Sequence, residues 1–83
     1  MKYEITVRED QYIFAEIMAG GQSRIFRLYG GLAIDRENKI LALKGSVDFD
    51  ATKKAQRVDN LNACDVFVEN YDSVIYSIKK FTP

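Results

Sequence analysis

The segment from Tyr12 to Gly21, YIFAEIMAGG, is apolar on almost every side and decides how this fold can be built. Because side chains alternate along a strand, an extended conformation gives the segment two faces. The first face carries the small and aliphatic residues Ile13, Ala15 and Ile17. The second face carries the larger residues Tyr12, Phe14 and Met18. Since both faces are apolar, the sequence predicts a central strand with something packed on each side.

The same segment can also be interpreted as a helix, because Asp10 is a suitable N-cap and Gly20 a suitable terminator. The succession of Tyr12, Ile13 and Phe14 favours a strand instead, since all three residue types have high strand propensity. We expect a strand over residues 12–19, with the helix as the alternative.

Further strands are expected on both sides of this segment, from alternating apolar residues bounded by turn residues. They cover residues 2–8, 24–29, 32–35, 40–44, 65–70 and 74–81. The Gly-rich stretch GGQS is suited to a hairpin turn, and the polar stretch RENK is expected to make a hairpin with a four-residue connection. The last two strands are expected to form a closing hairpin around YDS.

The chain changes character at residues 50–63. Asp50 is a suitable N-cap, and apolar residues recur after it at helical spacing, namely Ala51, Ala55, Val58 and Leu61. The predicted class is therefore α+β, with a mostly antiparallel sheet of about five to seven strands and one helix, about 50–63, packed on one face. The small residues of the face that carries Ala15 would let this helix approach closely.

The predicted helix is too small to cover all the apolar residues of the sheet. Its buried stripe is mostly alanine, whereas large aromatic residues also need burial, among them Phe14, Phe26, Tyr29, Phe67, Tyr76 and Phe81. Each large side chain removed from water contributes about 1.5–3 kcal/mol. Three arrangements can cover the second face: curvature of the sheet into a partial barrel, a second copy of the chain, or another protein.

The residues expected to contact a partner follow from this surplus of apolar side chains. Aromatic residues are frequent anchors of protein interfaces, and polar residues surround them. The expected protein-interface residues are Tyr12, Phe14 and Met18 as apolar contacts, with Arg24, Arg27, Tyr29 and Lys53 as the polar rim.

Length and composition restrict the class of protein. A chain of 83 residues is expected to form a single domain over residues 1–83, and 47% hydrophobic residues are enough for it to collapse. The 12 basic and 12 acidic residues cancel, so no global field attracts a nucleic acid or an anionic membrane. The single cysteine, Cys64, favours a reducing cytoplasm, and neither a signal peptide nor a membrane span is expected.

The residue types needed for most catalytic sites are missing. The chain has no histidine, which excludes Ser-His, Cys-His and histidine-ligated zinc sites, and one cysteine cannot make a dithiol or thiolate metal site. Asp48 and Asp50 form a DxD pair, but helix capping explains Asp50 without a metal. The glycine pairs lack the spacing of phosphate-binding loops. We expect no enzymatic activity, no metal and no cofactor.

These observations favour a small non-enzymatic protein that binds another protein or protein complex stoichiometrically, as inhibitor or adaptor, with a homodimer as a further possibility. In size and composition the chain is similar to the small inhibitors encoded by phages and mobile elements, such as anti-CRISPR proteins; this similarity is of class only and involves no motif.

Two other functions remain as alternatives. One is a nucleic-acid-binding module or histidine-free ribonuclease, in which Arg24, Arg27, Lys53 and Arg57 hold phosphates. The equal number of acidic residues disfavours it. The other is a small-ligand sponge whose pocket is formed by an oligomer.

Overall fold

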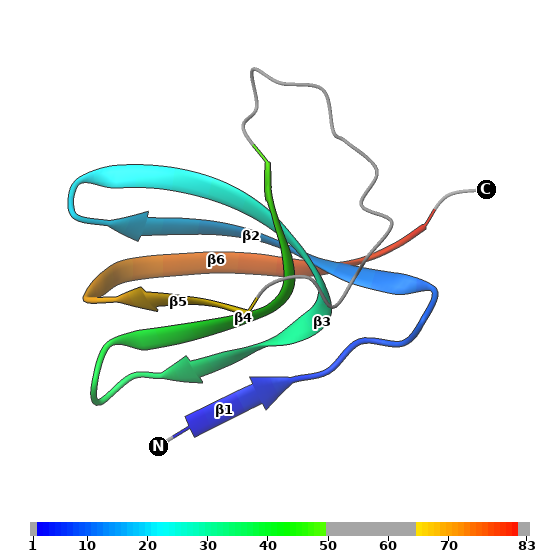
Figure 1. Cartoon of the computed structure of the whole chain (residues 1–83), viewed down its shortest axis with the longest axis horizontal. Coiled ribbons are helices and arrows are strands. Elements are labelled where there is room, and N and C mark those ends of the chain that lie inside the picture. The colour runs from blue at the N-terminus through cyan, green and yellow to red at the C-terminus, as the bar shows by residue number, and fades with distance from the viewer. Residues whose placement is uncertain (1, 50–64, 82–83) are drawn as a thin grey trace.

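The computed structural model describes residues 2–49 and 65–81, and six strands account for most of them. Their bounds are β1 Lys2–Ile5, β2 Gln11–Ala19, β3 Gln22–Asp35, β4 Ile40–Phe49, β5 Asp65–Glu69 and β6 Tyr71–Lys80. All pairings are antiparallel, and the strands form one sheet in the order β5, β4, β3, β2, β6, with β1 paired to β3 (Figure 1).

The long strand β3 holds two parts of this sheet together. Its first half pairs with β2, with Ile13 opposite Leu28, and its second half pairs with β1, with Ile5 opposite Leu32. Between the halves the register against β4 shifts, in the interval from Leu28 to Gly31. Such a bulge bends and twists a strand, so one continuous strand contributes to two differently directed parts of the sheet.

The bend lets the sheet cover its own apolar face. One cluster of buried side chains comes from both parts of the sheet: Ile13, Ala15, Ile17, Phe26, Leu28, Leu32, Ile34, Leu41, Leu43 and Tyr71. Ile5, Val66 and Val74 from three other strands pack against its margin. The face of β2 that carries Ala15 is thus buried against residues of β3 and β4, and the core lies within the concave side of the sheet.

The expected α+β class is wrong for the part of the chain that the structure describes. Residues 2–49 and 65–81 contain strands and turns and no helix, so the fold there is an all-strand antiparallel sheet. The predicted helix at 50–63 lies outside the described residues. The physical reason for the error is that the prediction used a helix to cover the face of Ile13 and Ala15, whereas the bent sheet covers that face itself.

The hairpin predictions have mixed outcomes. The four-residue connection RENK is confirmed, since Asp35 and Ile40 are opposite one another at its ends. The turn after β2 is shorter than expected: Gly20 and Gly21 alone form it, both with positive φ, as a two-residue type I′ hairpin requires. Residues 24–29 and 32–35 are parts of the single strand β3, because the bulge carries the strand through the two glycines between them.

The closing hairpin around YDS is wrong. β5 pairs with β4 and β6 pairs with β2, so the two strands lie at opposite ends of the strand order. Only Asn70 separates them, with φ of 55°, and Tyr71 immediately begins β6. A single residue is too short for a hairpin loop, and it instead turns the chain from one edge of the bent sheet to the other (Figure 1). Buried Tyr71 packs beneath the ammonium group of Lys39 at this corner, 5.6 Å from the ring centroid.

Within the described ranges, no helix could cross a membrane.

Candidate protein-binding surface

The side of β2 that faces away from the core carries most of the predicted contact residues. We call this the outer face. It consists of every second residue of β2, counted from Tyr12, and of the residues opposite them on β3 and β6. Phe14 is opposite Arg27 on β3 and Ser77 on β6, so these three side chains share the outer face. Tyr12, Phe14, Met18 and Arg27 are all half-buried, which means that the outer face is neither sealed nor fully solvated.

An aromatic trio lies at one end of the outer face. The ring centroids of Tyr12, Tyr29 and Phe81 are 5.5 to 5.7 Å apart, and the rings of Tyr29 and Phe81 are stacked within 9° of parallel. The guanidinium carbon of Arg27 lies 5.3 Å from the Tyr12 centroid. Rings in this range attract one another, and a cation over a ring face adds to the attraction. The trio is therefore a preassembled aromatic surface, with Phe81 still 46% exposed.

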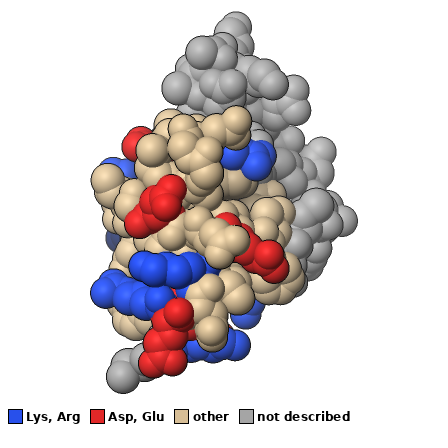
Figure 2. Space-filling model, turned by 90° about the vertical axis from the view of Figure 1, so that its left-hand side faces the viewer, with Lys and Arg blue, Asp and Glu red and all other residues tan. Residues whose placement is uncertain are grey.

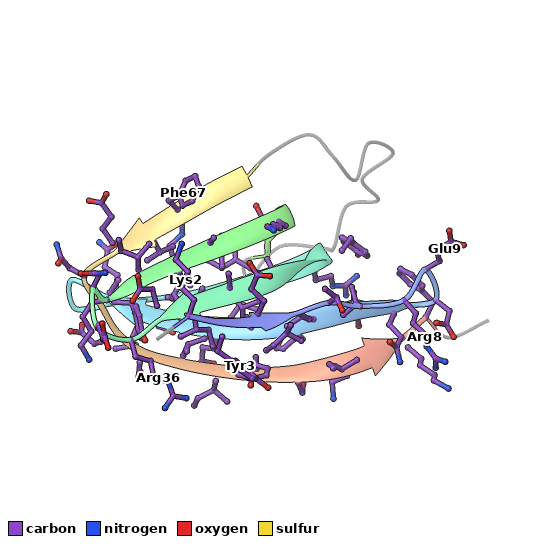
Figure 3. All side chains as sticks on the ribbon, turned by 90° about the horizontal axis from the view of Figure 1, so that it is seen from below. Lys2, Tyr3, Arg8, Glu9, Arg36 and Phe67 are labelled. Carbon is purple, nitrogen blue, oxygen red and sulfur yellow. The ribbon has the colours of Figure 1, made fainter. Side chains whose placement is uncertain are left out.

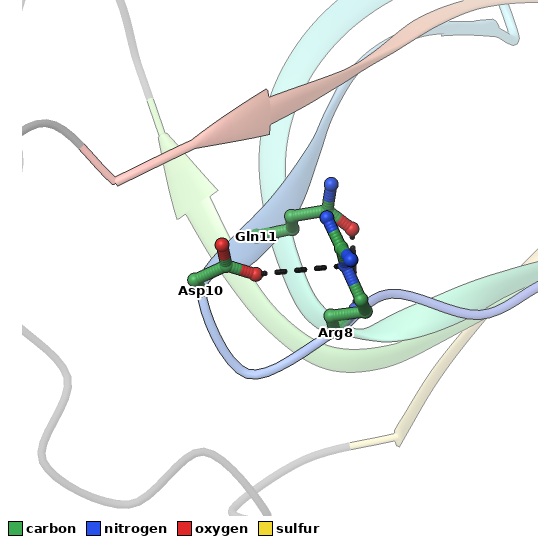
Figure 4. A network of polar contacts seen from close by, with 3 residues as sticks. All are labelled: Arg8, Asp10 and Gln11. Atoms are coloured by element: carbon green, nitrogen blue, oxygen red, sulfur yellow. Dashed lines mark hydrogen bonds and ion pairs between the residues drawn. The ribbon is translucent and has the colours of Figure 1, made fainter.

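The chain positions Phe81 by continuing the pairing of β6 one residue beyond its end. The amide of Phe81 donates to the carbonyl oxygen of Asp10, at 2.9 Å. Asp10 is held in a tight turn, in which the Gln11 amide donates to the Arg8 carbonyl at 2.9 Å and the Arg8 amide donates to Gln11 Oε1 at 3.3 Å. The Arg8 side chain also lies 3.8 Å from the Asp10 carboxylate (Figure 4). This turn fixes the ring of Phe81 beside Tyr12.

A shallow groove adjoins the trio where this turn meets it. Its volume is about 360 Å³, and its lining consists of Val7, Arg8, Glu9, Gln11, Tyr29 and Phe81. Arg8 and Glu9 both lie at the end of the molecule where β2 begins (Figure 3). The groove thus combines two aromatic rings with one basic and one acidic side chain. A peptide or protein surface with apolar and charged groups could occupy it.

Strand β6 exposes apolar side chains on both of its faces. Ile75 on the outer face is 70% exposed, and Ile78, on the same side of β6 as the core residues, is 49% exposed. Tyr76 lies between them and shares a hydrogen bond with Tyr3 of β1. Loss of solvation raises the pKa of Tyr76 above its ordinary value of 10.0, and this hydrogen bond acts in the same direction. Figure 3 shows Tyr3 next to β6.

A second depression of about 310 Å³ lies on the convex side of β1, β3, β4 and β5. It is bordered by charges of both signs, from Lys2, Glu4, Asp35, Lys44 and Glu69, and by the ring of Phe67. Phe67 is 66% exposed and projects from β5 away from Tyr3 and β6 (Figure 3). Because opposite charges alternate around it, this depression lacks the single sign that would select an anion or a cation.

Charges of both signs also lie side by side on the face that carries the hairpin turns (Figure 2). This face therefore offers no extended basic stripe of the kind that binds a nucleic-acid backbone. Residues 2–49 and 65–81 also bring together no group of three acidic or cysteine side chains that could hold a metal ion.

The structure brings together most of the predicted interface residues. Tyr12, Phe14, Met18, Arg27 and Tyr29 all belong to the outer face. Arg24 does not, because it is opposite Ile17 and lies over the ring of buried Phe26, 5.1 Å from the centroid. Lys53 lies outside the described residues.

Sequence reasoning missed Phe81 and Ile75 as members of the outer face. From the sequence, Phe81 is only one of several aromatic residues that need burial. The alternation of β6 could have placed Ile75, but its face depends on the pairing partner, and the sequence suggested pairing with residues 65–70 instead of β2. Comparison of the chain with protein-family models, with curated proteins and with solved structures gave no match in any of the three.

Proposed function

We propose that this protein is a non-enzymatic binding protein that recognises another protein through its outer face. The observation that carries the proposal is the aromatic trio of Tyr12, Tyr29 and Phe81, assembled on the convex side of the sheet and partly open to solvent. Protein interfaces are enriched in aromatic and arginine anchors, and here Arg27 lies against the trio. The single cysteine supports a cytoplasmic location for this activity.

The outer face is also suited to binding because it is not part of the core. The core cluster contains Ile13, Ala15 and Ile17 from β2, whereas Phe14 and Met18 alternate with them and stay half-buried. A partner can cover the outer face without any rearrangement of the sheet. Rigid, preformed apolar surfaces lose little conformational entropy on binding, which favours affinity.

The placement of the arginines supports a protein partner over a nucleic acid. Arg24 and Arg27 lie on opposite sides of β3, and the Nε atom of Arg27 is buried. Phosphate recognition by a strand needs basic groups presented together on one exposed face. A fluorescence titration at about 50 mM salt is expected to show no affinity for RNA or DNA, and binding that weakens steeply with salt would favour the nucleic-acid alternative.

The decisive test is the replacement Phe14→Asp, assayed by capture from the native cell with tagged protein and mass spectrometry. A carboxylate in the middle of an apolar contact surface loses its hydration on binding, so we expect capture of the partner to fall at least about tenfold. The variant should stay folded, because Phe14 is outside the core cluster. Circular dichroism and the urea midpoint measure this.

The matched control is Phe67→Asp, which introduces the same charge at an exposed phenylalanine on β5. It should retain capture. Equal capture by both variants would contradict the proposal. Unfolding of Phe14→Asp would contradict it as well, since Phe14 would then belong to the core.

A further inference from the structure

Strand β6 is the longest edge of the sheet. It pairs with β2 on one side, and no strand in residues 2–49 or 65–81 pairs with its other side. It is ten residues long, and its side chains are exposed or half-exposed throughout after buried Tyr71. Its centre is nevertheless apolar, with Val74, Ile75, Tyr76 and Ile78. An exposed apolar edge of this length is a template for pairing with another strand.

We propose that β6 pairs antiparallel with β6 of a second copy of this chain, in the register that places Tyr76 opposite Tyr76. The two copies would be related by a twofold axis through this pair, and the sheet would run continuously through β2 and β6 of both copies. The interface is closed and isologous, so pairing stops at the dimer instead of continuing into a fibre.

Charge complementarity supports the second copy as the occupant of this edge. In the proposed register Asp72 lies opposite Lys80 of the second copy, and the twofold axis repeats this pair at the other end of the interface. Val74 lies opposite Ile78 of the second copy between these charge pairs and the central tyrosines. Directly opposed side chains on neighbouring strands are about 4.5–5.5 Å apart at Cβ, so the acid and base are in contact range.

The outer side of the same strand pair is also complementary. Ile75 lies opposite Ser77 of the second copy, and the two copies of Ile75 are diagonal neighbours across the axis, about 7–8 Å apart. Large side chains reach one another over this distance. The pairing therefore covers the most exposed apolar side chain of the described surface, which is 70% exposed in the single chain.

Neighbouring registers lose this complementarity. A shift by two residues that centres the pair on Ile75 places Asp72 opposite Ile78, and a shift that centres it on Ser77 places Val74 opposite Lys80. Each shift puts a charged group against an apolar one. Register shifts by an odd number of residues are excluded. They would place a residue whose N–H and C=O groups point to the free edge opposite one whose groups point toward β2.

The other end of the strand order does not share this property. β5 has five residues and is acidic at both ends, with Asp65 and Glu69. Antiparallel self-pairing of β5 about Phe67 would oppose two acidic residues twice, which is unfavourable. The self-complementary edge of this sheet is β6.

The dimer would have a consequence for the proposed binding surface. A twofold axis perpendicular to the sheet keeps the outer faces of both copies on the same side. Tyr12 is opposite Lys79 on β6, and Lys79 would be opposite Ser73 of the second copy. The two Tyr12 residues, one in each aromatic trio, would then be about 14 Å apart across the strands and about 20 Å apart along them. The dimer would thus offer two binding surfaces to one partner assembly.

The first test is a charge exchange, measured by sedimentation equilibrium of the full chain. We expect the natural sequence to sediment at twice its mass of 9.5 kDa. Asp72→Lys and Lys80→Asp should each weaken the dimer at least about tenfold, because each variant creates like-charge pairs at both ends of the interface. The double variant Asp72→Lys with Lys80→Asp should restore the dimer, since the charge pairs are re-formed in reverse.

The control for Asp72→Lys is Glu4→Lys, which also replaces an acidic residue by lysine, but at an exposed position of β1. It should leave the dimer unchanged. A natural chain that stays at 9.5 kDa at every accessible concentration would overturn the proposal. Failure of the double variant to restore association would overturn the proposed register.

The second test uses disulfide cross-linking in a Cys64→Ser background, so that the introduced thiol is the only one. Tyr76→Cys should form a covalent dimer under mild oxidation, because directly opposed Cα atoms lie about 4.5–5.5 Å apart, within the range of a disulfide. Ile78→Cys, on the same side of the same strand, should not, because its copies would be about 14 Å apart along the strands. Cross-linking at Ile78→Cys equal to that at Tyr76→Cys would contradict the register.

This inference does not depend on the proposed function. Phe14→Asp is expected to lose partner capture and keep the dimer, whereas Asp72→Lys is expected to lose the dimer. A monomeric natural chain that still captures its partner would overturn the dimer alone.

Discussion

Single side chains fix the turns that set the register of this sheet. Asp35 ends β3, and both of its carboxylate oxygens accept hydrogen bonds from Asn38, from the backbone amide at 3.2 Å and from the side-chain amide at 3.0 Å. These bonds close the four-residue turn and hold Lys39 in the left-handed region with φ of 56°. The hydrogen bonds from Asn38 lower the pKa of Asp35 below its ordinary value of 3.8, and the charge of Lys2 acts in the same direction.

The lowered pKa of Asp35 predicts a pH-dependent contribution to stability. A depressed pKa in the folded state stabilises the fold above the unfolded-state pKa, and this contribution is lost as the pH falls through the folded-state value. We therefore expect Asp35→Ala to reduce the free energy of unfolding at neutral pH. The difference between variant and natural chain should disappear well below pH 3.8. Urea unfolding at both pH values measures it, and a difference that persists in acid would contradict the role of the carboxylate.

At the scale of one element, β3 shows how a strand can serve two parts of a sheet. Gly31 has φ of 130°, in a region that favours glycine, and a Cβ atom there would lie 2.7 Å from the carbonyl oxygen of Ile5. The bulge therefore combines a backbone conformation and a close approach of β1 that other residues do not tolerate. The bulge lies directly before Leu32, the residue of β3 that is opposite Ile5 of β1.

Gly31→Ala is accordingly expected to destabilise the fold by at least about 3 kcal/mol, since backbone strain and a clash with a main-chain atom add together. The comparison variant is Gly20→Ala, at a turn where φ is also positive, 58°, but no atom lies within 4 Å of the added Cβ. It should cost only about 1 kcal/mol, from the left-handed conformation alone. Denaturant titration of both proteins gives the two values, and equal losses would show that the close approach to Ile5 is relieved without cost.

At the scale of the whole molecule, the bent sheet separates a core from a surface for binding. The concave side contains the buried cluster from β2, β3 and β4 with Tyr71 of β6, and the convex side contains the aromatic trio. Large apolar side chains also remain exposed at the edges, on β5 and β6. In residues 2–49 and 65–81, large apolar side chains remain outside the buried cluster, and these side chains are the basis of both proposals.

A pair of truncations tests this separation. Leu41→Ala removes a fully buried side chain at the centre of the core and should cost about 2–5 kcal/mol in the free energy of unfolding. Phe67→Ala removes a larger side chain that is 66% exposed and should change stability by less than about 0.5 kcal/mol. Chemical denaturation monitored by circular dichroism distinguishes them; a large loss for Phe67→Ala would mean that this ring is covered in solution.

The sequence predicted those features that depend on neighbours along the chain. The alternation of β2, the position of the hairpin that follows it and the four-residue turn after Asp35 follow from local residue preferences, although the turn after β2 is shorter than the expected GGQS. The division of β2 into a face with Ala15 and a face with Phe14 also follows from alternation, so five of the seven predicted contact residues do share one face.

Local pattern could not show what lies against each face or which strands pair. Three features depend on contacts between residues far apart in the sequence. They are the continuation of β3 through its two central glycines, the crossing from β5 to β6 and the exposure of Ile75. The direction of each side chain along a strand is set by the backbone. The sequence of β2 therefore determines by itself that both of its faces are apolar. Only the bend of the sheet decided that one face closes on its own chain and the other stays open, because that depends on where distant strands meet.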